Sequence, residues 1–274
     1  MTLKMTFPET HTLLTRLDGG VLYLTLNRPE SRNAMSSEML ADIEAVFEAI
    51  RDDRRVRAVV LRGAGGHFCA GGDLKSMMAG LKPPAAGEAD PIAAMNRAFG
   101  AMLRTVQRAP QVVIAVCEGA VMGGGFGLAC VSDVAFAHAD AKFGLPETTR
   151  GLPPAQIAPF VVERIGLTQA RRLALTGAQV RGAEALALGV VHEGFADEAE
   201  LQHKLMATLQ KVLGCAPEAN AVTKAILLQV GKADFDQVLD AAAAQFAACA
   251  RGTEAPEGIT AFVQKRSPKW ATVT

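Results

Sequence analysis

The sequence predicts an α/β fold in which strands and helices alternate over residues 1–195 and helices alone follow over residues 196–274. Two observations favour this class. Residues 56–63 (VRAVVLRG) and 111–119 (QVVIAVCEG) are apolar runs rich in β-branched residues that end in glycine, as expected of buried parallel strands. Each run leads into a glycine-rich loop and then a predicted helix, so two units share one outline. We therefore interpret the chain as one α/β core with a helical C-terminal region.

The N-terminal part predicts a hairpin and a helix. Residues 13–17 and 21–26 are strand-like and flank Asp18-Gly19-Gly20, where glycines supply the positive φ of a tight turn. Ser36 or Ser37 can cap a helix that runs to about residue 51. One face of this helix is apolar and predicts its buried side, with Met39, Leu40, Ile43, Val46, Phe47 and Ile50.

The elements that follow complete the pattern. Asp73 can start a short helix over 74–80, and the residues of 80–91, rich in Pro, Gly and Ala, predict a surface loop. Residues 133–144 indicate two short strands, or a strand and a bend. Helices are expected at 92–108, 155–165, 168–175, 182–188, 196–213, 216–231, 235–250 and 256–265.

Composition excludes several classes of protein. The 274 residues contain 28 Lys and Arg against 28 Asp and Glu, and this zero net charge disfavours a nucleic-acid partner. No run of 18 apolar residues predicts a membrane span, and the N-terminal sequence lacks the apolar stretch of a signal peptide. Five cysteines without CxxC spacing indicate reduced thiols and a cytoplasmic location. We expect no metal and no bound cofactor.

The two glycine-rich loops, CAGGD (69–73) and MGGGFG (122–127), carry the chemical signal. Glycines at a helix N-terminus let several backbone N–H groups approach one point, where they can bind an anion or a developing oxyanion. Two such loops, if they converge, can each supply one N–H to a single oxygen. The helix is then expected to begin behind Gly123–Gly125. The alternative interpretation is a pair of tight strand-to-helix turns. Neither loop fits a nucleotide-phosphate motif, and no GxSxG nucleophile motif is present.

Three motifs together resemble a known family. FCAGGDLKSM (68–77), GAVMGGGFGLACVSD (119–133) and KFGLPE (142–147), in this order and spacing, are similar to the enoyl-CoA hydratase/isomerase family. The resemblance extends from LNRPESRNAM (26–35) to TAFVQKRSPKW (260–270). It implies the crotonase (ClpP-like) fold of repeated ββα turns, a C-terminal region that forms homotrimers or hexamers, and an acyl-CoA thioester as substrate.

The same resemblance implies roles for individual residues. The thioester oxygen would accept the N–H groups of Gly72 and Gly124, with Gly123 beside them, and Glu147 would be the catalytic carboxylate. Coenzyme A would contact several further residues, some of them reaching it from a neighbouring subunit. These are Arg32, Ala34, Ala70, Asp73, Leu74, Phe262 and Lys265.

Gly127 departs from the pattern, because hydratases of this family hold the water between two glutamates and the second would stand here. The run GLPPAQIAPFVVERIG (151–166) is similar to that of bacterial isohexenylglutaconyl-CoA and methylglutaconyl-CoA hydratases. Such substrates carry a branch at C3 and a distal carboxylate, which Gln156 or Arg150 could bind. The distal carboxylate, or a backbone group near Gly127, could then orient the water.

Three functions stay open at this point. The first is a hydratase for a C3-branched enoyl-CoA, and the second is an enoyl-CoA isomerase that uses Glu147 alone. The third is a non-catalytic CoA- or RNA-binding member of the fold, since a fold alone does not fix a function. His138 and His192 are interpreted as structural side chains.

Overall fold

A mixed sheet forms the centre of the protein. The computed structural model describes residues 7–73, 84 and 87–271. Within them the larger sheet has the strand order β1-β2-β3-β4-β6-β9. The hairpin strands are antiparallel and all later neighbours are parallel. The bounds are β1 Leu13–Asp18, β2 Val21–Leu26, β3 Ala58–Gly63, β4 Val112–Cys117, β6 Val134–His138 and β9 Glu193–Phe195.

The predicted hairpin and both predicted buried strands are confirmed. Gly19 and Gly20 have φ values of +54° and +77°, as the turn requires. Along β3, Val59 and Leu61 lie in the core cluster on one face of the sheet, and Val60 lies in the cluster on the other. This two-sided burial explains why the strand is apolar throughout instead of alternating.

A smaller sheet lies beyond the end of β4. It consists of β5 (Ala120–Met122), β7 (Lys142–Gly144) and β8 (Gln179–Arg181), with β5 and β7 parallel and β7 and β8 antiparallel. The two short strands expected at 133–144 are confirmed as β6 and β7. The strands β5, β8 and β9 were not predicted from the sequence, because three residues are too few to show a period of two.

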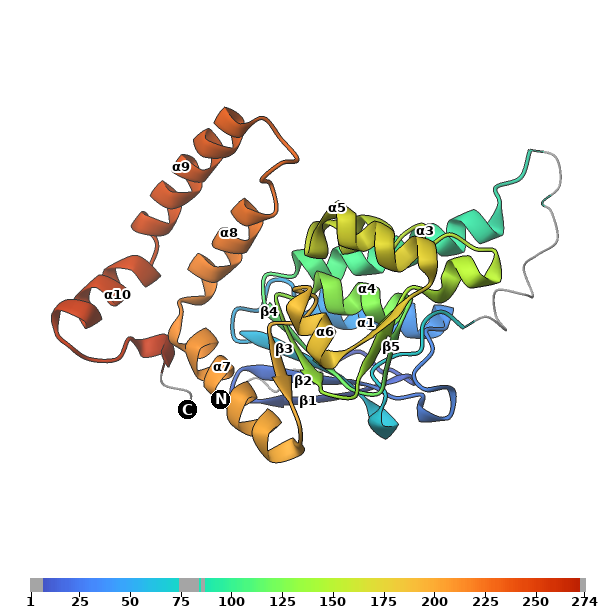
Figure 1. Cartoon of the computed structure of the whole chain (residues 1–274). Helices are drawn as coiled ribbons and strands as arrows, with labels where there is room; N and C mark the ends of the chain where they lie inside the picture. Colours follow the sequence, from blue (N-terminus) through green and yellow to red (C-terminus); the bar gives the residue numbers. More distant parts are fainter. Residues whose placement is uncertain (1–6, 74–83, 85–86, 272–274) are drawn as a thin grey trace.

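The helices on one side of the large sheet carry the functional region (Figure 1). They are α1 (Ser37–Ile50), α3 (Pro91–Arg108), α4 (Gly124–Val131) and α5 (Ala158–Thr176). The six residues predicted for the buried face of α1 are all buried. Its N-cap is Ser36, whose hydroxyl accepts the N–H of Met39 at 3.2 Å. The two helices predicted at 155–165 and 168–175 form one element that bends at Gly166, where φ is +73°. The expectation for α4 was wrong in one respect, because the helix begins at Gly124, inside the glycine run.

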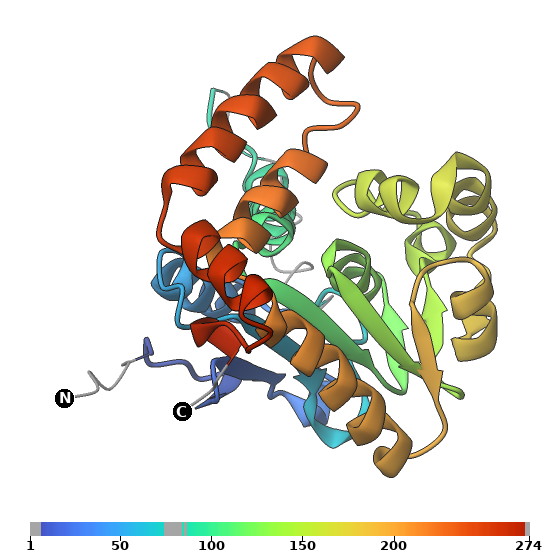
Figure 2. The same cartoon turned by 90° about the vertical axis from the view of Figure 1, so that its left-hand side faces the viewer.

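The C-terminal helices fall into two groups. After α6 (Gly182–Ala187), α7 (Glu198–Gly214) covers the other face of the sheet through Leu201, Leu205 and Leu209. Helices α8 (Pro217–Leu227), α9 (Phe235–Arg251) and α10 (Glu254–Val263) then form an arm that extends away from the sheet (Figures 1 and 2). No helix in the described part of the chain has both the length and the apolar composition of a membrane span.

Lys224 of α8 joins the arm to the core. Its ammonium donates to the carboxylate of Asp133 at 2.7 Å and to the carbonyl of Gln111 at 3.0 Å. The same Asp133 oxygen accepts the N–H of Val113 at 2.7 Å. The first turns of the arm are therefore tied to β4 and β6.

Candidate active site

The two glycine loops meet beside the carboxyl ends of β3 and β4. The N–H of Cys69 donates to Ala120 O and the N–H of Met122 donates to Cys69 O, each at 2.9 Å. On its other side, the N–H of Met35 donates to Gly71 O at 2.8 Å, and Asp73 N–H donates to Met35 O at 2.9 Å. Residues 69–73 are thus held as an extended segment between β5 and the start of α1.

Gly125 permits this close approach. A Cβ on residue 125 would lie 2.6 Å from the carbonyl oxygen of Cys69 and 2.7 Å from its Cβ, far inside normal contact distance. Close packing against Cys69 therefore explains the glycine at residue 125, which a tight turn alone would not require. The two glycine-rich loops therefore converge, as the oxyanion interpretation requires.

Gly72 and Gly124 bring two free donors to this junction. Gly124 is the first residue of α4, so its N–H has no partner within the helix. Among the residues that the structure describes, neither Gly72 N–H nor Gly124 N–H has a hydrogen-bond acceptor. Both glycines line one cavity of about 410 Å³. Unpaired N–H groups at the edge of a cavity are suited to binding a developing negative charge.

The walls of this cavity are largely apolar with a few polar groups. Helices α1, α3 and α4, together with residues 146–157, enclose it. Its apolar side chains include Met35, Leu40, Phe99 and Ile157, and its polar side chains include Asp90, Asn96, Glu147, Arg150 and Gln156. Such a composition is typical of a site for a mainly apolar ligand with a few oriented polar atoms.

Glu147 lies on the 3₁₀ turn η3 (Pro146–Arg150), which follows β7. Its Oε2 atom is buried and has no hydrogen-bond partner in the described structure, and its Oε1 atom contacts Gly123. Burial raises the pKa of the carboxyl group, while its own backbone N–H and the charge of Arg150 act in the opposite direction. A desolvated carboxyl group in a cavity is suited to proton transfer near neutral pH.

The chain matches the family model described as Enoyl-CoA hydratase/isomerase over residues 16–272. The protein belongs to the enoyl-CoA hydratase/isomerase family. Its architecture is the crotonase fold of that family, as the sequence predicted.

Individual relatives agree with this assignment. The crystal structure of an enoyl-CoA hydratase/isomerase from Marinobacter aquaeolei is 55% identical, covers 95% of this chain and 99% of its own, and superposes with a TM-score of 0.92. Pseudomonas aeruginosa AtuE is 58% identical over 96% of this chain and 100% of its own, with a TM-score of 0.91. The 2,3-dehydroadipyl-CoA hydratase of Escherichia coli is 30% identical over 90% of this chain and 94% of its own. The protein is therefore an enzyme, and a relative named as a hydratase agrees with the hydro-lyase class predicted from the sequence.

Gly127 of this hydratase/isomerase faces apolar side chains. It lies in the first turn of α4, is buried and does not line the cavity. A Cβ on residue 127 would lie 3.1 Å from Leu103 Cδ1 and 3.3 Å from Ile157 Cγ2. The space that a second carboxylate would enter is thus filled by two aliphatic side chains.

The early loop that joins β2 to α1 holds the first glycine segment in place. The amide of the buried Asn33 donates to Ala64 O at 2.9 Å and to His67 O at 2.7 Å, and its oxygen accepts the N–H of Arg28. Arg28 donates to Ala34 O and forms an ion pair with Asp73 at 3.1 Å. The roles of Asn33 and Arg28 were not predicted from the sequence, although both lie inside the motif LNRPESRNAM. Asn33 has a φ of +58°, a region that asparagine tolerates, so the residue type itself was compatible with a turn at this position.

The residues expected to bind coenzyme A fall in three places. Asp73 lines the main cavity, while Arg32 and Ala70 line an adjoining hollow of about 440 Å³ together with other residues including Lys142. Ala70 belongs to both cavities. Ala34 is held by Arg28 beside them. Leu74 lies outside the described residues, as do the helix predicted at 74–80 and half of the loop predicted at 80–91.

Phe262 and Lys265 lie at the end of the arm and line neither cavity. Phe262 is 86% exposed, and Lys265 adopts a φ of +53° just after α10. If these two residues contact coenzyme A, the geometry requires a site other than the cavity of their own chain.

His138, His192 and Cys69 have surroundings that indicate structural roles. His138 Nε2 lies 3.0 Å from Ala196 O, and His192 Nδ1 accepts the N–H of Ala135 at 3.0 Å. Burial raises the pKa of Cys69 to about 12, so this thiol is protonated at neutral pH and is not a nucleophile. Within the described residues, no group of three His, Cys, Asp or Glu side chains could hold a metal ion.

Proposed function

We propose that this enzyme adds water across the 2,3 double bond of a C3-branched enoyl-CoA that carries a distal carboxylate, such as isohexenylglutaconyl-CoA or methylglutaconyl-CoA. The observation that carries the proposal is the set of groups in the 410 Å³ cavity. It has two free N–H donors, one desolvated carboxyl group, and Gln156 and Arg150 as donors for an anion. Such a set suits an acyl group that brings its own negative charge.

Gly72 and Gly124 supply the electrostatic part of the mechanism. The thioester oxygen of the substrate would accept both N–H groups, and negative charge grows on this oxygen when the enolate forms. Donors that are fixed before the reaction need no reorganisation, and one such donor contributes roughly 3–4 kcal/mol to transition-state stabilisation.

Glu147 performs both proton transfers in this proposal. As a carboxylate it accepts a proton from the water whose oxygen bonds to C3, and the electron pair of the double bond moves toward the thioester as the enolate. The protonated Glu147 then delivers the proton to C2. The product contains the added water in full, and Glu147 returns to its carboxylate form. Its raised pKa favours such an exchange.

The distal carboxylate would lie between Gln156 and Arg150. Both side chains line the cavity together with Glu147. The E. coli relative is named for a dehydroadipyl, and hence dicarboxylic, acyl group, which supports this substrate class within the family. The substrate's own carboxylate would then help to orient the water, since the side chains nearest to a Cβ on residue 127, Leu103 and Ile157, are apolar.

Binding of coenzyme A and self-association are part of the same proposal. The hollow beside the cavity carries Arg32, Lys142 and Arg150, three cationic side chains suited to the phosphates of the nucleotide. The arm exposes large apolar side chains, which indicates a surface covered by other copies in a homotrimer or hexamer. Phe262 and Lys265 would then reach the coenzyme A of a neighbouring copy. The exposed set includes Leu227, Val230, Phe235, Leu239, Phe246, Ile259 and Phe262.

An isomerase that uses Glu147 alone is the second candidate, and the apolar surroundings of Gly127 favour it. One carboxyl group is enough to move a proton between C2 and C4. A non-catalytic CoA- or RNA-binding protein has no such observation in its favour. The buried Oε2 atom of Glu147 has no hydrogen-bond partner among the described residues, and binding alone does not explain the cost of that arrangement.

A substrate screen tests the proposal. Purified enzyme is incubated with a straight-chain enoyl-CoA, methylglutaconyl-CoA and isohexenylglutaconyl-CoA, while enoyl absorbance and the mass of the products are followed. We expect a product heavier by one water, formed fastest from a branched glutaconyl ester. A product of unchanged mass with a moved double bond would establish the isomerase instead, and no turnover of any ester would exclude both.

A further inference from the structure

Two consecutive residues of the loop before α5 fill two notches in neighbouring helices. Gln156 lies against Gly100 of α3, and Ile157 lies against Gly127 of α4. A Cβ on residue 100 would overlap Oε1 of Gln156, and would lie 2.9 Å from its Cδ and 3.2 Å from its Cβ. Each notch exists because the helix has a glycine where any other residue would place a carbon atom.

Gly100 has no conformational reason to be glycine. It lies ten residues into α3 and is not one of the glycines with positive φ. Glycine within a helix destabilises the helix relative to alanine. Gly100 is buried and lies against Gln156. We therefore attribute the glycine to the space that its missing side chain leaves for Gln156.

The side chain of Gln156, which lies in the notch at Gly100, is polar and can bind a ligand. Gln156 is partly buried and lines the cavity together with Glu147. Among the described residues, its carboxamide has no hydrogen-bond partner. A primary amide can donate two hydrogen bonds from its nitrogen. It can therefore bind a carboxylate without placing an unpaired cation in a mainly apolar cavity.

We propose that Gly100 is a positioning residue that sets the acyl selectivity of the enzyme, because its missing side chain lets the Gln156 carboxamide lie against α3 and present its N–H groups to the distal carboxylate of the substrate. This inference rests on the proposed function. Gly100 itself touches no reacting atom and acts through Gln156. A methyl group at residue 100 would force the Gln156 carboxamide out of its observed position, because that group overlaps Oε1 and lies 2.9 Å from Cδ, whereas the Gln156 Cβ atom at 3.2 Å would need only a small shift.

Gly100→Ala tests this role through a ratio of two substrates. The measured quantity is kcat/KM for a branched glutaconyl-CoA ester divided by kcat/KM for a straight-chain monocarboxylic enoyl-CoA. We expect Gly100→Ala to lower this ratio at least about tenfold, the size of one hydrogen bond to a charged group. The change should lie mainly in KM for the glutaconyl ester. An unchanged ratio would overturn the inference.

A double-mutant cycle shows whether Gly100 acts through Gln156. In the Gln156→Ala background, Gly100→Ala should leave the ratio unchanged, because the carboxamide that it displaces is absent. An equal fall in both backgrounds would overturn the inference. The matched control is Gly127→Ala, whose added carbon has its nearest contacts with Leu103 and Ile157. A fall in the ratio as large as that of Gly100→Ala would point to general packing and overturn it too.

Gln156→Glu keeps the test decisive if Gly100→Ala does not fold. The substitution preserves the size of the side chain and places a negative charge against the distal carboxylate. We expect at least about a tenfold fall in the same ratio, and an unchanged ratio would contradict the contact. Failure of the proposed function is recognised separately, because wild-type enzyme would then not hydrate the glutaconyl ester at all.

Discussion

The carboxylate of Glu147 occupies the space that a side chain on Gly123 would need. A Cβ on residue 123 would overlap Oε1 of Glu147 and lie 3.4 Å from its Cδ. Gly123 also has a φ of +48° and caps the start of α4. The same glycine therefore places Glu147 in the cavity and allows the turn that exposes the N–H of Gly124.

Gly123→Ala should displace Glu147 and abolish most activity. A loss of roughly 10²- to 10⁴-fold in kcat is expected, the range for removing a general acid–base group. The matched control is Gly151→Ala, at the end of η3. It has a similar positive φ of +77°, but nothing lies within 4 Å of its added carbon. Backbone strain alone would reduce the thermal stability of both variants, whereas only Gly123→Ala should lose activity. Equal kcat values for the two variants would contradict the contact.

Glu147 should make the enzyme less stable as pH rises. Burial raises the pKa of this carboxyl group in the folded protein, so the folded state binds its proton more tightly than the unfolded state does. The free energy of unfolding therefore falls as pH rises from the ordinary carboxyl pKa through the raised value. Glu147→Gln removes the charge, and we expect a higher Tm than wild type at pH 7–8 with no difference near pH 3.

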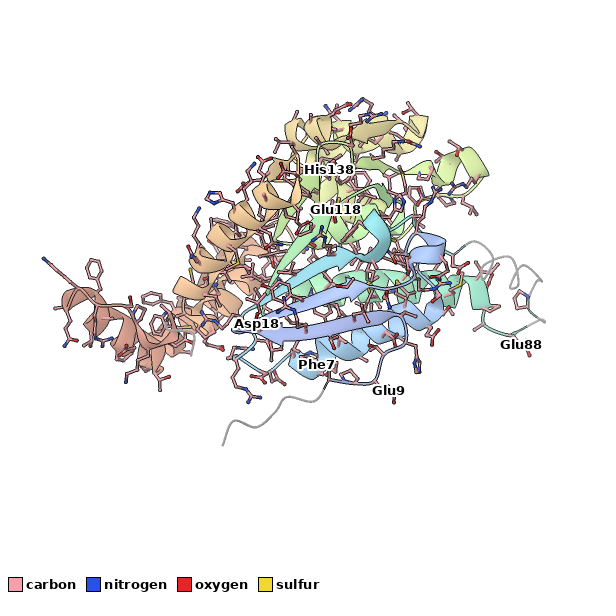
Figure 3. The ribbon with its side chains drawn as sticks, turned by 90° about the horizontal axis from the view of Figure 1, so that it is seen from below. Phe7, Glu9, Asp18, Glu88, Glu118 and His138 are labelled. Atoms are coloured by element: carbon pink, nitrogen blue, oxygen red, sulfur yellow. The ribbon has the colours of Figure 1, made fainter. Side chains whose placement is uncertain are left out.

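The exposed Glu88 provides the control for this comparison. It lies at the outer edge of the molecule (Figure 3), and Glu88→Gln should leave Tm unchanged at both pH values. Glu147→Gln should also lose kcat by roughly 10²- to 10⁴-fold. A variant that is less stable than wild type at pH 7 would show that the carboxylate is not desolvated at a cost.

The sequence was sufficient for the fold but not for the interior of the site. Periodicity identified the buried face of α1 residue by residue and the hairpin strands to within one residue, because these features follow from local spacing. The roles of Gly100 and Asn33 could not be predicted in this way. Gly100 serves a side chain 56 residues later, and Asn33 bonds to carbonyls about 30 residues away. Such pairs become visible only when the loops are in place.

The surroundings of Gly127 are a second feature that the sequence alone could not predict. The missing carboxylate could be recognised from the sequence, but the identity of the groups that replace it could not. Ile157 comes from a loop and Leu103 from α3, and both reach residue 127 only through tertiary packing. The surroundings of Gly127 are therefore contributed by two other elements, which local sequence does not reveal.

Gly127→Glu should accordingly fail to restore a second catalytic carboxylate. The new side chain would have to displace Leu103 and Ile157, whose atoms lie 3.1 and 3.3 Å from its Cβ. Overpacking and an unpaired buried charge should together destabilise the protein by at least about 2 kcal/mol. Urea denaturation measures this loss, with Gly127→Ala as the uncharged control. A stable Gly127→Glu enzyme with faster hydration of a glutaconyl ester would show that the missing glutamate had not been replaced.

Gly72 allows the oxyanion donor to be removed with a close control. An added Cβ at residue 72 meets nothing within 4 Å, and its φ is not in the left-handed region. Gly72→Ala keeps the backbone N–H and should retain kcat within a few-fold. Gly72→Pro removes that N–H, and kcat should fall roughly 10²- to 10³-fold, the effect of losing one oxyanion donor. Comparable Tm values for the two variants would show that the backbone segment is intact. If Gly72→Pro then turned over substrate as fast as Gly72→Ala, the N–H of residue 72 would not bind the thioester oxygen, and the enolate would need another donor.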